Sequence, residues 1–132
     1  MAIATYLNPE SMLSNPAFTQ AVRVPAGMDT LYIGGQNGFD STGQLGDTLA
    51  AQAEQALTNL QACLAAAGAT IENVVKWTIL VVDGQDVRAG FAAFQRVWGQ
   101  RPNPPAITVA KVAGLAVPGA LVEIEAVAAI PG

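Results

Sequence analysis

The sequence predicts an α+β fold in which one mixed β-sheet carries two helices on one face. Two helical patterns alternate with β-forming segments in the order strand, strand, helix, strand, helix, strand, strand. Hydrophobic residues make up 52% of the 132-residue chain and charged residues only 12%. The length fits one domain spanning residues 1–132. The apolar surplus exceeds what one such domain needs, so we expect a homo-oligomer that buries part of it between subunits.

The first third of the chain is expected to hold short strands. Residues 1–16 contain two prolines and predict an irregular or edge segment, whereas residues 18–24 alternate weakly and predict a strand. After a turn, residues 30–33 predict a short apolar strand that stops at Gly34–Gly35. A loop rich in Gly, Asp and Ser then covers residues 37–46.

A long helix is predicted between Asp47, a favourable N-cap, and Gly68, a favourable C′ residue. Polar residues, Gln52 among them, fall mostly on the solvent side of this helix. Cys63 lies near the apolar side and is expected to pack as a small hydrophobe. The apolar face repeats at helical spacing and consists of Leu49, Ala53, Ala56, Leu57, Leu60, Leu64 and Ala67.

The second half predicts a strand, a helix and two further strands. Residues 73–82 are enriched in β-branched and aromatic side chains, which is typical of a largely buried strand. Apolar residues from Val87 to Trp98 repeat at helical spacing, and Gly99 closes this second helix. A proline-rich loop cannot continue the helix, so residues 107–112 and 120–129 are expected as the last two strands.

Charge and composition exclude several classes of function. The net charge is −4 and the six basic residues are scattered, which argues against binding of nucleic acid through its phosphates. The start of the chain does not resemble a signal peptide, and no apolar run has the length of a membrane span. The single cysteine rules out an intramolecular disulfide. We therefore expect a cytoplasmic protein without a membrane partner.

The chain contains no histidine, and this restricts its chemistry further. Ser–His and Cys–His nucleophile pairs are absent, as is the usual general base near neutral pH. With one cysteine as well, a zinc site would consist of carboxylates alone, so neither a metal nor a cofactor is expected. Catalysis would have to rest on carboxylates, hydroxyls, backbone groups, positioned water or lysine.

An ordered set of motifs resembles the RidA (YjgF, reactive-intermediate deaminase) family. The resemblance runs from about Asn15 to the C-terminus. It implies a chorismate-mutase-like fold, assembled as a homotrimer with ligand clefts between subunits. The motifs that carry it are Ile33-Gly34-Gly35-Gln36, residues 51–60, Ala66-Ala67-Gly68-Ala69, Asn73-Val74-Val75-Lys76, Pro104-Pro105-Ala106 and Val122-Glu123-Ile124-Glu125-Ala126.

Well-known members of this family hydrolyse reactive enamines and imines to 2-oxo acids and ammonia. The resemblance therefore implies a deaminase-like hydrolase of a small enamine, an imine or a related C–N bond. Glu125 matches the glutamate that positions the reacting water. The positions implied to bind the small-molecule substrate are Phe18, Gly34, Gly35, Gln36, Phe91 and Ile107.

Three of these positions depart from the pattern of the imine deaminases. Ile107 stands where they carry an arginine for the substrate carboxylate, while Phe18 and Phe91 replace a frequent tyrosine and asparagine. The lost charged hydrogen bond is worth about 1.5–3 kcal/mol. Lys111 or Arg101 could substitute from nearby. Otherwise such a cleft favours an uncharged or aromatic substrate over a simple imino acid.

Simpler interpretations stay open for the same residues. Glu125 could face solvent at the end of a strand, or pair with Arg23 or Lys76, and Glu123 on the same face is more simply a surface acid. Gly34–Gly35 could be no more than a β-bulge. The alternative to a hydrolase is a trimeric module that binds a small ligand without turning it over.

Overall fold

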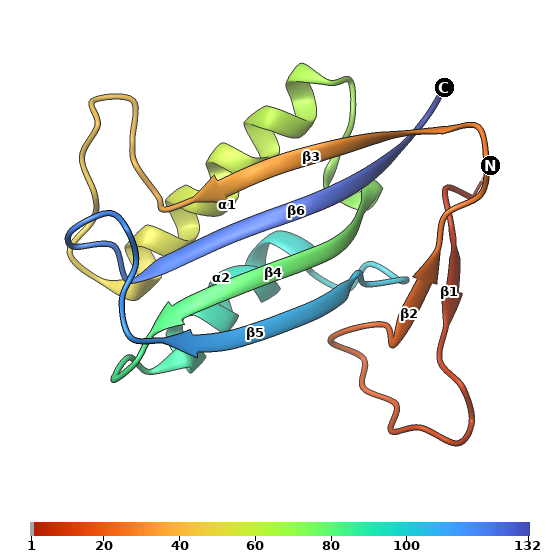
Figure 1. The fold of residues 1–132 in the computed structure, drawn as a ribbon, viewed down its shortest axis with the longest axis horizontal. Helices are drawn as coiled ribbons and strands as arrows, with labels where there is room; N and C mark the ends of the chain where they lie inside the picture. The colour runs from red at the N-terminus through yellow and green to blue at the C-terminus, as the bar shows by residue number, and fades with distance from the viewer. Residues whose placement is uncertain (1) are drawn as a thin grey trace.

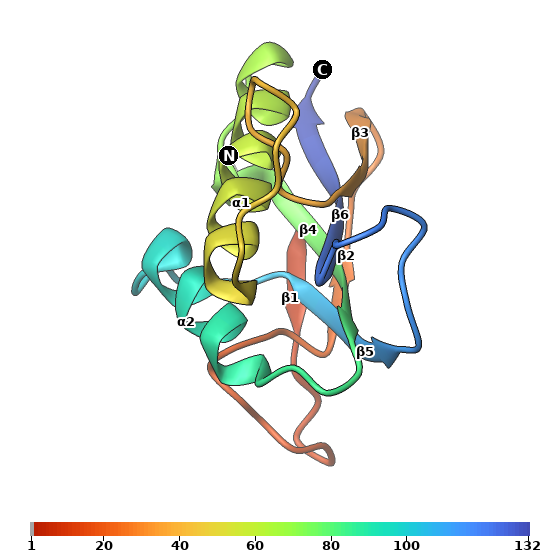
Figure 2. The same ribbon diagram turned by 90° about the vertical axis from the view of Figure 1, so that its left-hand side faces the viewer.

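The structure, a computed structural model that describes residues 2–132, contains a four-stranded mixed sheet with two helices against it (Figure 1). Both helices lie on the same side of the sheet (Figure 2). β6 is antiparallel to β3 and β4, whereas β4 and β5 are parallel. The predicted fold class is thus confirmed. In spatial order the strands are β3 (Met28–Gln36), β6 (Val122–Pro131), β4 (Val74–Val82) and β5 (Ala106–Val112).

Two further strands near the N-terminus form a separate sheet. β1 (Thr5–Leu7) and β2 (Ala21–Arg23) pair in antiparallel fashion, so the predicted strand over residues 18–24 is shorter than expected. Tyr6 and Val22 pack on a small buried cluster that includes Ala129 of β6. This hairpin covers only one end of the large sheet on the face away from the helices. We call that face the uncovered face.

The first helix, α1 (Leu49–Ala66), buries the apolar face that its spacing predicts, apart from Ala67, which is exposed at the end of the helix. Its N-cap is Thr48 rather than Asp47, because the Thr48 hydroxyl accepts a hydrogen bond from the Ala51 N–H at 3.1 Å. The expected packing of Cys63 is wrong, since this side chain is exposed.

Gln52 also differs from its prediction, because it is only 1% exposed. Its amide nitrogen donates to the carbonyls of Gly46 at 2.9 Å and Gly119 at 3.0 Å. Its amide oxygen accepts from the Leu121 N–H at 2.7 Å. Because these bonds satisfy the buried amide, Gln52 ties the loop before α1 to the turn that leads into β6.

The second helix, α2 (Val87–Trp98), begins at the N-cap Asp86 and ends before Gly99. A short 3-10 helix, η1 (Ile71–Asn73), precedes β4. Phe94 of α2 meets Trp77 of β4 edge to face, with ring centroids 5.4 Å apart. This contact fixes α2 over the β4–β5 side of the sheet. Within residues 2–132, neither helix combines the length and apolar character that crossing a bilayer requires.

Away from the register shifts in β3 and β4, side-chain alternation assigns the strand residues to one of the two faces. Ile124 and Ala126 of β6 belong to the core under the helices. Glu123 and Glu125, which alternate with them, therefore point to the uncovered face. On β5, Ile107 packs against the helix-side core, whereas Thr108 points the other way.

Candidate functional site

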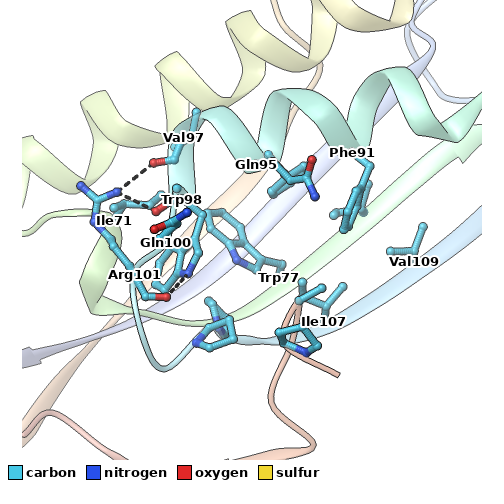
Figure 3. A pocket seen from close by; sticks show the side chains of 17 residues that line it. Ile71, Trp77, Phe91, Gln95, Val97, Trp98, Gln100, Arg101, Ile107 and Val109 are labelled. Atoms are coloured by element: carbon cyan, nitrogen blue, oxygen red, sulfur yellow. Dashed lines mark hydrogen bonds between the residues drawn. The ribbon is translucent and has the colours of Figure 1, made fainter. Parts of the chain in front are cut away.

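An apolar groove of about 440 Å³ opens between α2 and β5 on the helix side of the sheet (Figure 3). We call it the helix-side groove. A second hollow continues it along α2 toward Val87. Two of the expected substrate-binding residues, Phe91 and Ile107, lie in the wall of the helix-side groove. The main apolar lining consists of Trp77, Phe91, Phe94, Trp98, Ile107 and Val109.

Arg101 is the only charged residue among those that line the groove within residues 2–132. Its guanidinium donates to the carbonyls of Val97 at 3.0 Å and Trp98 at 2.8 Å, and pairs with Glu72 at 3.1 Å. A cation at these last carbonyls favours the end of a helix. The guanidinium points away from Ile107 (Figure 3), so it terminates α2 rather than replacing an arginine at position 107.

The other basic candidate, Lys111, lies near the far end of β5. It is not among the residues that line the groove. The hydrogen bonds from Arg88 hold the pKa of Asp86 below the usual range, and the charge of Lys111 makes a smaller contribution. Lys111 follows Ile107 and Val109 at two-residue spacing, so it lies on the helix side of β5.

The segment before β2 is anchored beside the proline loop that leads into β5. Thr19 donates its N–H to the Pro105 carbonyl at 3.2 Å and its hydroxyl to the Pro104 carbonyl. These bonds bring Pro16 and Ala17 into the wall of the groove. Phe18, the other aromatic candidate besides Phe91, is half-buried next to them but does not line the groove.

The uncovered face holds the two glutamates of β6. Glu125 lies opposite Thr78 of β4 and is exposed, whereas Glu123 lies opposite Leu80 and is half-buried. Lys76 donates to the hydroxyl of Thr108 at 2.6 Å. In the described part of the chain neither glutamate takes part in an ion pair.

Gly34 and Gly35 form a bulge in β3, because the pairing with β6 shifts between Ile33 and Gln36. The Gln36 amide nitrogen donates to the Gly34 carbonyl at 3.0 Å and so spans this bulge. A methyl group on Gly35 would lie 2.7 Å from the carboxyl carbon of Glu123, whereas one on Gly34 would meet nothing within 4 Å. Gly35 therefore leaves the space that the Glu123 carboxylate occupies.

Asn37 holds the same carboxylate from the other side. Its amide nitrogen donates to Oε1 of Glu123 at 3.1 Å and to the Val122 carbonyl at 3.2 Å. The side chain is largely buried, with 9% exposure. Glu123 is thus the glutamate of the pair with a defined orientation.

Five of the seven expected site residues fall into two groups that one chain does not bring together. Gly34, Gly35 and Glu125 belong to the uncovered face, whereas Phe91 and Ile107 belong to the helix-side groove. The sheet itself separates the two groups. A single cleft that contains both would need the uncovered face of one chain beside the groove of another.

Comparison with known proteins identifies the family. The sequence pattern of the endoribonuclease L-PSP family matches residues 10–130. The chain belongs to the RidA/YjgF family. Human 2-iminobutanoate/2-iminopropanoate deaminase is 41% identical over 113 residues, which cover 84% of this chain and 78% of the human protein. The RutC family protein y4sK of Sinorhizobium fredii is 40% identical over 113 residues, covering 83% and 84% of the two chains.

Solved structures from the same family share the fold. The conserved Rid family protein YyfB from Yersinia pestis superposes with a TM-score of 0.86 at 33% identity, covering 98% of this chain and 100% of that one. The YjgF gene product from E. coli gives a TM-score of 0.70 at 32% identity over 80% and 83% of the two chains. The chorismate-mutase-like arrangement of two helices on a mixed sheet is therefore that of the RidA/YjgF family.

Two features of this RidA/YjgF chain are not apparent from sequence reasoning. The contact of Asn37 with Glu123 joins residues 86 positions apart, and nothing local to either one signals it. The aromatic contact of Trp77 with Phe94 in the groove is the second feature, because the sequence assigns these side chains only to the core or to an interface.

Within residues 2–132 the structure brings no three metal-ligating side chains together.

Proposed function

We propose that this RidA/YjgF chain is a deaminase-like hydrolase of a small enamine, an imine or a related C–N bond, acting in a cleft between subunits. One observation carries the proposal. The Glu123 carboxylate, seated on a glycine bulge, and an apolar groove that contains Phe91 and Ile107 lie on opposite faces of the chain. Deaminase relatives near 40% identity support the reaction class.

The chemistry asks little of the protein. Water adds to the electrophilic imine carbon, the C–N bond of the resulting carbinolamine breaks, and a carbonyl and ammonia form. A carboxylate can accept a proton from the water as it attacks and return it to the departing nitrogen. No histidine is needed for such a reaction, in keeping with its absence from the sequence.

The carboxylate that positions water is one of the two on β6. The resemblance assigns this role to Glu125, which is exposed on the uncovered face. The geometry adds Glu123, which is half-buried and held by Asn37. Pre-organised groups contribute most to catalysis, so Glu123 is the stronger candidate and Glu125 remains the second.

The groove would supply the ligand's other contacts. Aromatic and branched apolar side chains dominate its wall, and the guanidinium of Arg101 is already bound to the end of α2. A buried apolar wall disfavours a free carboxylate. We therefore expect an uncharged or aromatic substituent at Ile107 rather than the carboxylate of a simple imino acid.

The description of the family as endoribonucleases raises RNA cleavage as another activity. The net charge of −4 and the scattered basic residues disfavour a polyanionic substrate. The specific alternative to a hydrolase is a small-ligand-binding trimer without turnover. The apolar side chains of Phe18, Phe91 and Ile107 favour it, since they remove polar substrate contacts.

The test measures ammonia release from freshly generated 2-iminopropanoate and from an aromatic imino acid, with wild type compared with Ile107→Arg. We expect wild type to prefer the aromatic probe and Ile107→Arg to gain turnover of 2-iminopropanoate by about tenfold or more. Glu123→Gln and Glu125→Gln, assayed alongside, should identify the residue that positions water. No release from any probe by either protein would exclude the hydrolase and leave the binding module.

A further inference from the structure

We propose that Asn37 is a positioning residue that holds the Glu123 carboxylate ready to receive the reacting water. The inference rests on the proposed hydrolase function and deepens it. Asn37 contacts neither the groove nor Glu125 through any hydrogen bond that the structure shows for residues 2–132. Its polar contacts are the Glu123 carboxylate at 3.1 Å and the Val122 carbonyl at 3.2 Å.

The position of the Asn37 side chain requires a hydrogen-bond donor. Both partners of Asn37 are acceptors, one a carbonyl oxygen and the other a carboxylate oxygen. A carbonyl has no proton to donate, so the NH₂ group of the side chain must face them. An aspartate of the same shape would place an oxygen against two acceptors, and a leucine of similar volume would leave both unpaired.

The backbone around Asn37 cannot shift freely to compensate for such a change. The next residue, Gly38, has a φ of +86°, and a methyl group there would lie 2.3 Å from the carbonyl oxygen of Gln52. Gln52 in turn fixes the backbone of Leu121 just before β6. The loop that carries Asn37 and the strand that carries Glu123 are therefore anchored to the same turn of α1.

This arrangement leaves the two carboxylate oxygens of Glu123 in different states. Oε1 is bound by the Asn37 amide, whereas Oε2 lies over Gly35, where a methyl group would come within 2.8 Å of it. The uncovered face beyond Gly35 is where a neighbouring subunit would bring its ligand. Oε2 is thus the oxygen that can accept a hydrogen bond from water.

The experiment is a double-mutant cycle on ammonia release, using wild type, Asn37→Leu, Glu123→Gln and the double variant. Loss of a hydrogen bond to a charged group should lower kcat by about tenfold to a hundredfold in Asn37→Leu. KM should change little, because Asn37 does not contact the ligand. In the Glu123→Gln background the same change should alter kcat less than about twofold, since Asn37 acts through Glu123.

A matched control separates positioning from general damage to the loop. Asn59 of α1 donates its amide to the Phe39 carbonyl at 2.8 Å and so ties down the same loop, two residues beyond Asn37, without touching Glu123. Asn59→Leu should lower the melting temperature but leave kcat near the wild-type value. Equal losses of kcat in Asn59→Leu and Asn37→Leu would overturn the positioning role.

A second measurement does not depend on turnover. The side-chain NH₂ signals of Asn37 in an NMR spectrum should shift in Glu123→Gln and stay in place in Glu125→Gln. Active wild type with equal effects of Asn37→Leu in both backgrounds overturns the inference and leaves the hydrolase intact. Inactive wild type overturns the hydrolase and the positioning role together, and unresponsive NH₂ signals overturn the contact itself.

Discussion

At the scale of single residues, the two glycines of the β3 bulge have different structural roles. Gly35 leaves room for the Glu123 carboxylate, whereas Gly34 faces open space. We predict that Gly35→Ala displaces the carboxylate and lowers kcat/KM for imine hydrolysis by about tenfold to a hundredfold. Gly34→Ala adds the same methyl group without a contact and should stay within about twofold of wild type. Equal kcat/KM values for the two variants would contradict this account.

Sequence reasoning reached the neighbourhood of the site, but it placed Glu125 above Glu123 on the family resemblance alone. Glu123 and Glu125 are two residues apart, so strand alternation places both on the same face and cannot distinguish them. What separates them is the Asn37 amide and the space over Gly35, and both depend on how β3 pairs with β6. Such long-range strand pairing cannot be predicted from the local sequence pattern.

At the scale of the elements, α2 depends on its N-cap. The Asp86 carboxylate accepts from the Arg88 backbone N–H at 3.0 Å and from the Arg88 guanidinium at 3.0 and 2.9 Å. The side-chain hydrogen bonds from Arg88, followed by the backbone one, hold the pKa of Asp86 below its usual range. A carboxyl group whose pKa is lowered by folding stabilises the fold above its unfolded pKa, and this contribution is lost as pH falls through the folded pKa.

We predict that Asp86→Asn removes this pH-dependent contribution while keeping a competent cap. The free energy of unfolding, measured by denaturant titration between pH 2 and pH 7, should differ most between wild type and Asp86→Asn near neutral pH. The difference should shrink as the solution becomes acidic. Arg88→Met keeps the Asp86 carboxylate but removes the guanidinium. The free energy of unfolding of Arg88→Met near neutral pH should therefore lie closer to that of Asp86→Asn than the wild-type value does. A constant difference at every pH would argue against the assignment.

The elements themselves were the most predictable level of this structure. Helical spacing located α1 and α2, and β-branched enrichment located β4, because each signal is local and repeated. The errors occur where tertiary contacts decide. Gln52 is buried because three backbone groups reach it, and β3 extends through Gly34–Gly35 because a bulge lets the strand continue.

At the scale of the whole molecule, the uncovered face exposes apolar and aromatic side chains that a second chain could bury. Tyr32 lies on this face, opposite Val127, and is 78% exposed in the single chain. We propose a homotrimer and predict a light-scattering mass three times the 13.5 kDa of one chain. Tyr32→Glu should reduce this mass and the ammonia release together, because a charge opposes burial in an interface. Gln61→Glu, on the exposed side of α1, should change neither. A wild-type mass of one chain would exclude the trimer.

The separation of the site over two faces has a consequence for mixtures of variants. In the proposed trimer, each chain contributes its carboxylate to the cleft with one neighbour and its groove to the cleft with the other. A chain disabled at Glu123 still has an intact groove, and a chain blocked at Ile107 still has an intact carboxylate. The Glu123 variant and the Ile107 variant, each inactive alone, should therefore recover ammonia release when they are unfolded and refolded together. In mixed trimers some subunit interfaces combine an intact carboxylate from one chain with an intact groove from the other.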